Sequence, residues 1–218
     1  MIKESLKYVL FDLDGTLTDP FEGITNSVAY SLKGYGIEVA DRKELSCFIG
    51  PPLYESYENY YGFSKEKAVE AVEKYREYFS VTGLFENKVY FGVEELLKDL
   101  IDKGIKVVLA TSKPEIFAKR ILEHFNLDCY FTEVVGSMLS GERVKKGDVI
   151  KEALRRLNNP SKETLIMVGD RSHDILGAKE NGLLSVGVLY GYGSREELSN
   201  SGADFIVKNI DELKKILF

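Results

Sequence analysis

Three short, uninterrupted apolar runs most strongly constrain what this chain can fold into. They are Tyr8–Phe11, Val107–Ala110 and Leu165–Val168. An apolar run without polar alternation is typical of a strand that is buried on both faces of a parallel sheet. Residues 93–100, 116–125, 149–157, 175–181 and 210–217 have helical spacing, and 133–136, 184–188 and 205–207 are shorter strand candidates. This alternation predicts an α/β fold with a mostly parallel, Rossmann-like sheet.

The strand signals disappear between about Thr18 and Phe85. In this segment Ile24, Val28 and Leu32 recur every four residues, which indicates helix. The sequence therefore predicts two domains. We expect a Rossmann-like core formed by residues 1–17 and 86–218, and a small all-helical domain, residues 18–85, inserted after the first strand.

Composition narrows the function classes. The 218 residues carry a formal net charge of −6, which disfavours broad contact with nucleic acid or anionic membranes. No segment has the pattern of a membrane span or signal peptide, so we expect a cytoplasmic protein. Two cysteines and two histidines without metal-ligand spacing support neither a zinc site nor a disulfide framework. Carboxylates are left to carry the chemistry.

Polar side chains follow three of the predicted strands. Open α/β sheets bind ligands beyond the carboxyl ends of their strands, so these side chains should share one crevice. They are Asp12 and Asp14, then Thr111, then Asp170 and Asp174. Four converging carboxylates repel one another unless a cation lies between them. Oxygen-only ligands favour Mg²⁺, with a substrate phosphate oxygen completing its coordination.

A carboxylate beside a bound phosphate can attack phosphorus and split the transfer into two easier steps. Asp12 is the predicted nucleophile. Asp14 is placed to protonate the leaving alcohol and then to activate water. Gly15 allows a sharp turn that would bring backbone N–H groups of the Leu13–Thr16 segment, Gly15 and Thr16 included, toward the phosphate, and the Thr111 hydroxyl is a further donor.

The Asp12-x-Asp14-Gly15-Thr16 segment resembles the signature of the haloacid dehalogenase superfamily. Thr111, in Ala-Thr-Ser-Lys-Pro, resembles its second motif, and Gly169-Asp170-x-x-x-Asp174 resembles its acidic fourth motif. The match covers nearly the whole chain. The family also requires a lysine that holds the nucleophile and phosphate; Lys146 fits best, and Lys145 is the competitor.

The resemblance assigns roles to these residues. Dehalogenases of the superfamily lack the second aspartate, so Asp14 favours a phosphatase or phosphomutase. Asp170 is expected to contact Mg²⁺ directly, and Asp174 to act through water or by orienting Lys146. The inserted helical domain would be a cap that excludes water while the phosphoenzyme exists.

Other site candidates have competing interpretations. Ser112 is a candidate phosphate ligand, but Ser112–Glu115 also fits a helix capping box. Gly50 and Pro51 belong to a rigid loop that resembles the cap loop facing the nucleophile. His173 is either a phosphate or substrate contact or a rim residue. Gly191–Gly193 either approaches the site or forms a turn.

The sequence thus predicts a Mg²⁺-dependent phosphatase acting on a small phosphorylated metabolite, most like phosphoglycolate phosphatase or a 5'-nucleotidase. A phosphomutase of the β-phosphoglucomutase type and a non-catalytic phosphate-binding protein are the alternatives. Neither nucleic acid nor membrane is an expected partner, and the chain is expected to be a monomer or homodimer.

Overall fold

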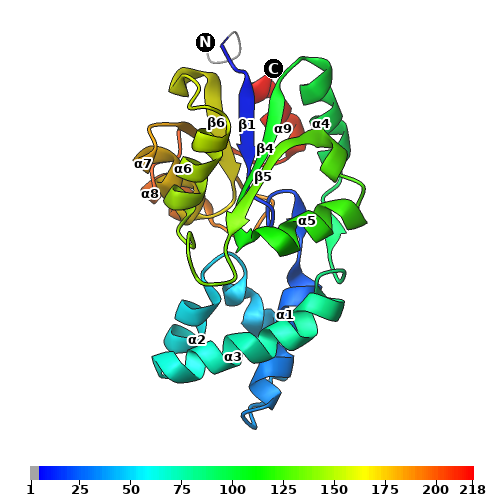
Figure 1. Cartoon of the computed structure of the whole chain (residues 1–218), viewed down its shortest axis with the longest axis vertical. Coiled ribbons are helices and arrows are strands. Elements are labelled where there is room, and N and C mark those ends of the chain that lie inside the picture. The colour runs from blue at the N-terminus through cyan, green and yellow to red at the C-terminus, as the bar shows by residue number, and fades with distance from the viewer. Residues whose placement is uncertain (1–4) are drawn as a thin grey trace. The chain divides into compact units, whose positions relative to one another are not determined.

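The computed structural model describes residues 5–218 (Figure 1). Contacts divide the chain into two units: one comprises the residues up to Thr18 and those from Val89 onward, and the other is Asp19–Lys88. The predicted boundaries, 17/18 and 85/86, lie close to these. At the two crossings, β2 (Thr18–Asp19) and β3 (Lys88–Val89) pair in a small sheet. The functional division into core and cap stays a prediction.

The larger unit contains a six-stranded sheet whose paired strands are all parallel. Its members are β1 (Tyr8–Phe11), β4 (Lys106–Pro114), β5 (Phe131–Ser137), β6 (Leu165–Gly169), β7 (Leu184–Val188) and β8 (Phe205–Val207). The spatial order is β5-β4-β1-β6-β7-β8, so β1 lies between β4 and β6. The predicted α/β class with a parallel sheet is confirmed.

Helices cover both faces of this sheet (Figure 1). They are α4 (Val93–Asp102), α5 (Glu115–His124), α6 (Lys146–Arg156), α7 (Ser172–Glu180), α8 (Arg195–Asn200) and α9 (Ile210–Leu217). The helices α6 and α7 lie on one face and α4 and α9 on the other (Figure 1). Val149 and Ala153 of α6 join Leu10 and Met167 of the sheet in one buried cluster. This packing fixes the start of α6 against the sheet.

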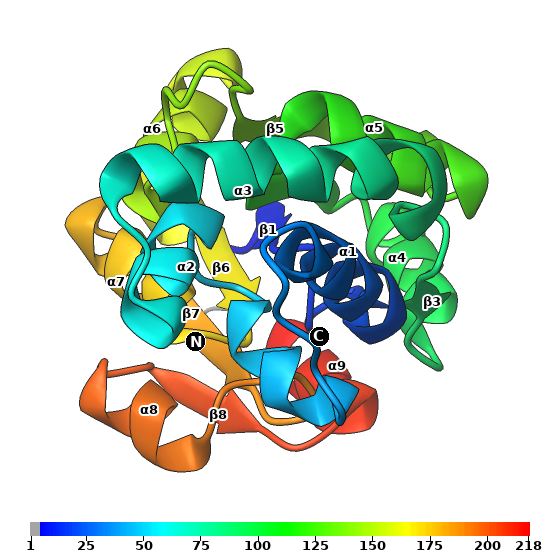
Figure 2. The same ribbon diagram turned by 90° about the horizontal axis from the view of Figure 1, so that it is seen from below.

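The smaller unit is built mainly from α1 (Phe21–Lys33), α2 (Leu53–Tyr61) and α3 (Lys65–Tyr78). The helix α3 packs against both α1 and α2 (Figure 2). Short 3₁₀ and π segments at Arg42–Phe48 and Phe79–Gly83 complete it. The regularly spaced apolar residues Ile24, Val28 and Leu32 are buried, as their helical pattern predicted.

Two local predictions were wrong. Ser112 does not cap a helix, because β4 continues through Pro114 and α5 begins only at Glu115, without a side-chain cap. The residue before a proline is biased toward extended backbone, which keeps this segment in the strand. The helix predicted from residue 149 begins at Lys146 instead. Among residues 5–218, no helix combines the length and apolar character needed to cross a membrane.

Candidate active site

Three acidic side chains meet beyond the carboxyl ends of β1 and β6. Asp12 directly follows β1, and its backbone N–H donates to Val168 O over 2.9 Å, which ties it to the neighbouring strand. Asp170 follows β6, and Asp174 lies in the first turn of α7. Each of the three offers an oxygen within 4.8 Å of those of the other two. The sequence predicted this convergence.

Lys146 lies in the middle of these acids. Its Nζ is 2.7 Å from Asp12 Oδ1 and 2.8 Å from Asp174 Oδ1, and it donates to Ala110 O over 3.0 Å. Burial disfavours the charged ammonium, but the two carboxylates outweigh that effect and raise the pKa of Lys146. Lys145 is exposed at the N-cap of α6. Of the two candidates, Lys146 is the one that reaches Asp12.

A second lysine, which the sequence analysis missed, contacts Asp14. Lys113 Nζ is 2.9 Å from Asp14 Oδ2, whereas Asp14 Oδ1 is buried without a hydrogen-bond partner. Burial raises the pKa of the Asp14 carboxyl although Lys113 opposes the shift. Lys113 lies two residues after Thr111 on β4. That spacing, Thr-x-Lys, was the available signal. Thr111 Oγ1 itself accepts from Lys113 N over 3.2 Å.

Asp170 is held from two directions. Tyr192 N donates to its Oδ2 over 2.8 Å, and Thr16 Oγ1 donates to its Oδ1 over 3.4 Å. The segment through Gly191 passes so close that a Cβ there would lie 2.3 Å from Gly15 O. Of the two interpretations of Gly191–Gly193, the structure supports the one in which this segment approaches the acidic cluster. Burial, with Asp174 and Asp12 nearby, holds the pKa of Asp170 well above its usual range.

The turn after Asp14 requires glycine at position 15 and is closed by its own backbone hydrogen bonds. Gly15 adopts φ of +81°, and a Cβ on it would lie 2.2 Å from Asp170 Oδ2, so the close approach requires glycine. Its N–H donates to Thr18 O over 2.8 Å, and Thr16 N–H donates to Leu13 O over 3.3 Å. The turn itself uses these two N–H groups, and a phosphate contact by the Leu13–Thr16 segment stays a prediction.

The acidic cluster fits a divalent cation. One lysine pairs with two of the three buried carboxylates. Burial and the neighbouring carboxylates raise the pKa of Asp170 and Asp174, which disfavours their charged forms, and a divalent cation between them would offset that repulsion. An all-oxygen donor set suits Mg²⁺. Asp174 Oδ1 lies 2.8 Å from Lys146 Nζ, and Asp174 Oδ2 accepts a hydrogen bond from Arg171 N. Its role in orienting Lys146 stays a prediction. Asp14 lies outside this cluster among the described residues, and its contact with a metal stays a prediction.

Among the described residues, no hydrogen bond or ion pair joins the remaining candidates to the acidic cluster. Ser112 is half-buried on β4, and His173 is exposed on α7. Gly50 and Pro51 belong to the smaller unit, between its 3₁₀ segment and α2. Their roles in substrate binding stay predictions.

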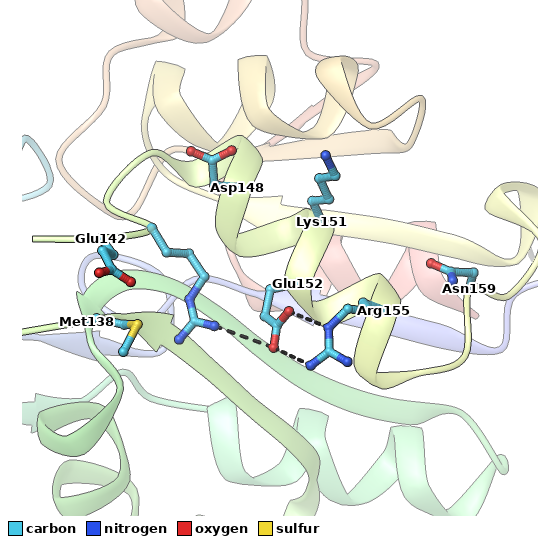
Figure 3. Close-up of a pocket in the computed structure, with 8 residues that line it drawn as sticks. Met138, Glu142, Asp148, Lys151, Glu152, Arg155 and Asn159 are labelled. Atoms are coloured by element: carbon cyan, nitrogen blue, oxygen red, sulfur yellow. Dashed lines mark hydrogen bonds and ion pairs between the residues drawn. The ribbon is translucent and has the colours of Figure 1, made fainter.

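A separate cleft of about 600 Å³ lies beside α6 and has a charged lining (Figure 3). Arg155 pairs with Glu152 at 2.7 Å, and Arg143 contacts the same carboxylate at 3.5 Å. The paired charges lower the pKa of Glu152 to about 2. None of the crevice residues lines this cleft, so it does not extend the site described above.

Comparison with known proteins identifies the family. The model of the haloacid dehalogenase-like hydrolases matches residues 9–188. A Pseudomonas aeruginosa protein named 5'-nucleotidase is 45% identical over 98% of this chain and 97% of its own length. Tyrosine-protein kinase PtkA of Mycobacterium tuberculosis is 38% identical over 98% of this chain and 73% of its own length.

Among solved structures, one described as a predicted phosphatase from Clostridium acetobutylicum has a TM-score of 0.94 and 54% identity, covering 97% of this chain and 98% of that one. The parallel α/β fold described above agrees with this structural match. The chain belongs to the haloacid dehalogenase-like hydrolase family.

Proposed function

We propose that this chain is a Mg²⁺-dependent phosphatase that hydrolyses a small phosphomonoester through an aspartyl-phosphate on Asp12. One observation carries the proposal. Asp12, at the end of the central strand β1, forms an ion pair with the buried Lys146, and a second carboxyl group, Asp14, lies two residues away with one oxygen that has no hydrogen-bond partner. A nucleophile and a separate acid/base group are the two parts that such a reaction requires.

In the first step, an Asp12 oxygen attacks phosphorus as the bond from phosphorus to the ester oxygen breaks. Asp14 gives a proton to that oxygen, so the alcohol leaves neutral. The Thr111 hydroxyl accepts from a backbone N–H, and its own hydrogen is available to a phosphate oxygen. Lys146 keeps Asp12 oriented and offsets the charge of the transferred group.

In the second step, Asp14 takes a proton from a water molecule whose oxygen attacks phosphorus. The bond from phosphorus to Asp12 breaks, and inorganic phosphate leaves with Asp12 restored. Asp12 and Asp170 are the residues that would hold Mg²⁺, with Asp174 supporting Lys146. When bound, the cation supplies positive charge against the phosphate oxygens.

The relative named 5'-nucleotidase supports a nucleoside monophosphate as the first substrate to test. Phosphoglycolate is the second candidate, suggested by the Thr-x-Lys-Pro segment and the Gly-Pro-Pro loop of the sequence. A phosphomutase of the β-phosphoglucomutase type would return the phosphoryl group to a sugar phosphate. The likeness to a protein named tyrosine kinase makes transfer from ATP to a tyrosine a further outcome to examine.

The test is phosphate release from nucleoside monophosphates, phosphoglycolate and sugar phosphates, with Mg²⁺ and with EDTA. We expect release that requires Mg²⁺ and is abolished in Asp12→Asn, while Asp148→Asn, an exposed control on α6, keeps full activity. Full activity in Asp12→Asn would overturn the proposed nucleophile. Transfer of the phosphoryl group to a tyrosine or to a sugar phosphate, without release of phosphate, would indicate a kinase or a mutase in place of a phosphatase. Phosphate binding without turnover would identify a non-catalytic protein.

A further inference from the structure

We propose that Glu197, on α8, is a positioning residue that sets the affinity of the Asp12, Asp170 and Asp174 cluster for its divalent cation. The proposal rests on the proposed function. Glu197 does not touch the cluster itself. Its carboxylate contacts residues 171 and 172, which lie between Asp170 and Asp174 in the chain.

Two contacts of the Glu197 carboxylate are made by the same oxygen, and the Ser172 side chain also hydrogen-bonds to this carboxylate. Ser172 N donates to Glu197 Oε1 over 2.7 Å, and Arg171 Nε is 3.0 Å from that atom. Arg171 N also donates to Asp174 Oδ2 over 3.1 Å. The position of the 171–172 backbone therefore bears directly on where the Asp174 carboxylate lies.

The N-terminus of α7 needs this external acceptor. The first N–H groups of a helix have no partner within the helix, and an oxygen-bearing side chain at the N-cap usually accepts from one of them. Here the N-cap residue is Arg171, whose side chain has no acceptor. Glu197 supplies a carboxylate from another helix, and negative charge is favourable at a helix N-terminus.

The helix that carries Glu197 is itself well anchored. Ser194 Oγ accepts from Glu197 N over 3.0 Å, and the neighbouring Leu198 is fully buried. Leu198 packs against Gly187 of β7 so closely that a Cβ on that glycine would lie 2.9 Å away. The loop leading into α8 also places Tyr192 N on Asp170 Oδ2. One segment, residues 192–197, thus contacts both Asp170 and the two residues that follow it.

Residues that orient metal ligands commonly change metal affinity about 10–100-fold when they are replaced. We expect Glu197→Ala to weaken binding of Mn²⁺, used as a spectroscopic probe and measured by electron paramagnetic resonance titration without substrate, by about tenfold. Glu197→Gln keeps an oxygen that can accept from Ser172 N and should recover most of the affinity. Glu196→Ala, an exposed neighbour on the same helix, is the matched control and should bind as the parent does.

Urea unfolding in EDTA accompanies the titration, so that a folding defect is separated from a change in the site. Unchanged Mn²⁺ affinity in Glu197→Ala would overturn the proposal, and so would equal weakening by Glu196→Ala or a failure of the glutamine variant to recover affinity. If Glu197→Ala binds Mn²⁺ more weakly than the parent and the parent itself shows no phosphatase activity, the role of Glu197 is upheld and the proposed function is rejected. A parent protein that binds no Mn²⁺ would overturn both.

Discussion

Replacing Lys146 with methionine removes the only ammonium group that contacts both Asp12 and Asp174 in the described part of the chain. Methionine retains most of the side-chain volume, so the packing of α6 on the sheet should be little changed. The variant leaves two buried carboxylates facing each other without their partner, and the carbonyl of Ala110 loses a donor as well.

The size of the effect follows from this burial. The Lys146 side chain is 3% exposed, and its partners Asp12 and Asp174 are 9% and 1% exposed, so solvent screens the pairs little. Removing one partner from a buried ion pair costs about 3–5 kcal/mol. With about 2–3 kcal/mol per molar urea, the unfolding midpoint should fall by roughly 1–2.5 M.

The pH of the assay matters because the pKa of Lys146 is raised on folding. A raised pKa contributes stability that is complete below the unfolded value, about 10.4, and is lost only as pH rises through the folded value. Urea unfolding at neutral pH therefore measures the full contribution. EDTA removes any cation that would offset the carboxylates.

Lys145→Met is the matched control, because Lys145 is the adjacent residue and is exposed. Its unfolding free energy should change by no more than about 0.5 kcal/mol. A Lys146→Met protein as stable as the parent, or equal loss in both variants, would refute the account of Lys146 as the charge partner of the acidic cluster.

Three further predictions test other parts of the structure. Gly15→Ala and Gly104→Ala both place alanine at positive φ; Gly104→Ala, which faces open space, should cost about 1 kcal/mol of stability, and Gly15→Ala should cost more and also lose phosphatase activity, because its Cβ collides with Asp170. Equal activities of the two variants would argue against the tight turn. Arg156→Met should lower stability by about 1 kcal/mol at neutral pH, measured by thermal unfolding, because it removes the partner of both Glu115 and Glu152. The difference should fade as pH falls through the lowered pKa of Glu115 and that of Glu152, about 2, and a difference independent of pH would contradict these ion pairs. Asp14→Asn should form phosphoenzyme from an activated aryl phosphate but turn it over slowly in rapid-quench assays, and normal turnover would remove Asp14 from the mechanism.

The central acidic residues of the site were predictable because they directly follow the ends of strands. The apolar runs ending at Phe11 and Val168 identified β1 and β6, and parallel strands bring their carboxyl ends to one edge of the sheet. The sequence could not supply the strand order that makes β1 the neighbour of both β4 and β6. It also placed the start of α6 too late, because the apolar periodicity begins at Val149 while Lys146 occupies the first turn.

The parts that escaped prediction depend on backbone geometry or on distant contacts. Lys113 was missed because β4 was expected to end at Ala110, and its continuation brings Lys113 to Asp14. Tyr192 acts through its backbone N–H, which any residue except proline provides. Glu197 reaches residues 171 and 172 from 25 positions away, and an acidic residue in the first turn of a helix is ordinarily explained by that helix alone.

The central claim is that Asp12 becomes covalently phosphorylated. Its most direct test is mass spectrometry of acid-quenched Asp14→Asn protein after brief exposure to an activated aryl phosphate and Mg²⁺. We predict the added mass of one phosphoryl group in the peptide that contains Asp12. This added mass should be absent from the double variant that carries both Asp12→Asn and Asp14→Asn. Release of the aryl alcohol and phosphate together, with no mass added to any peptide, would show direct attack by water and contradict the account.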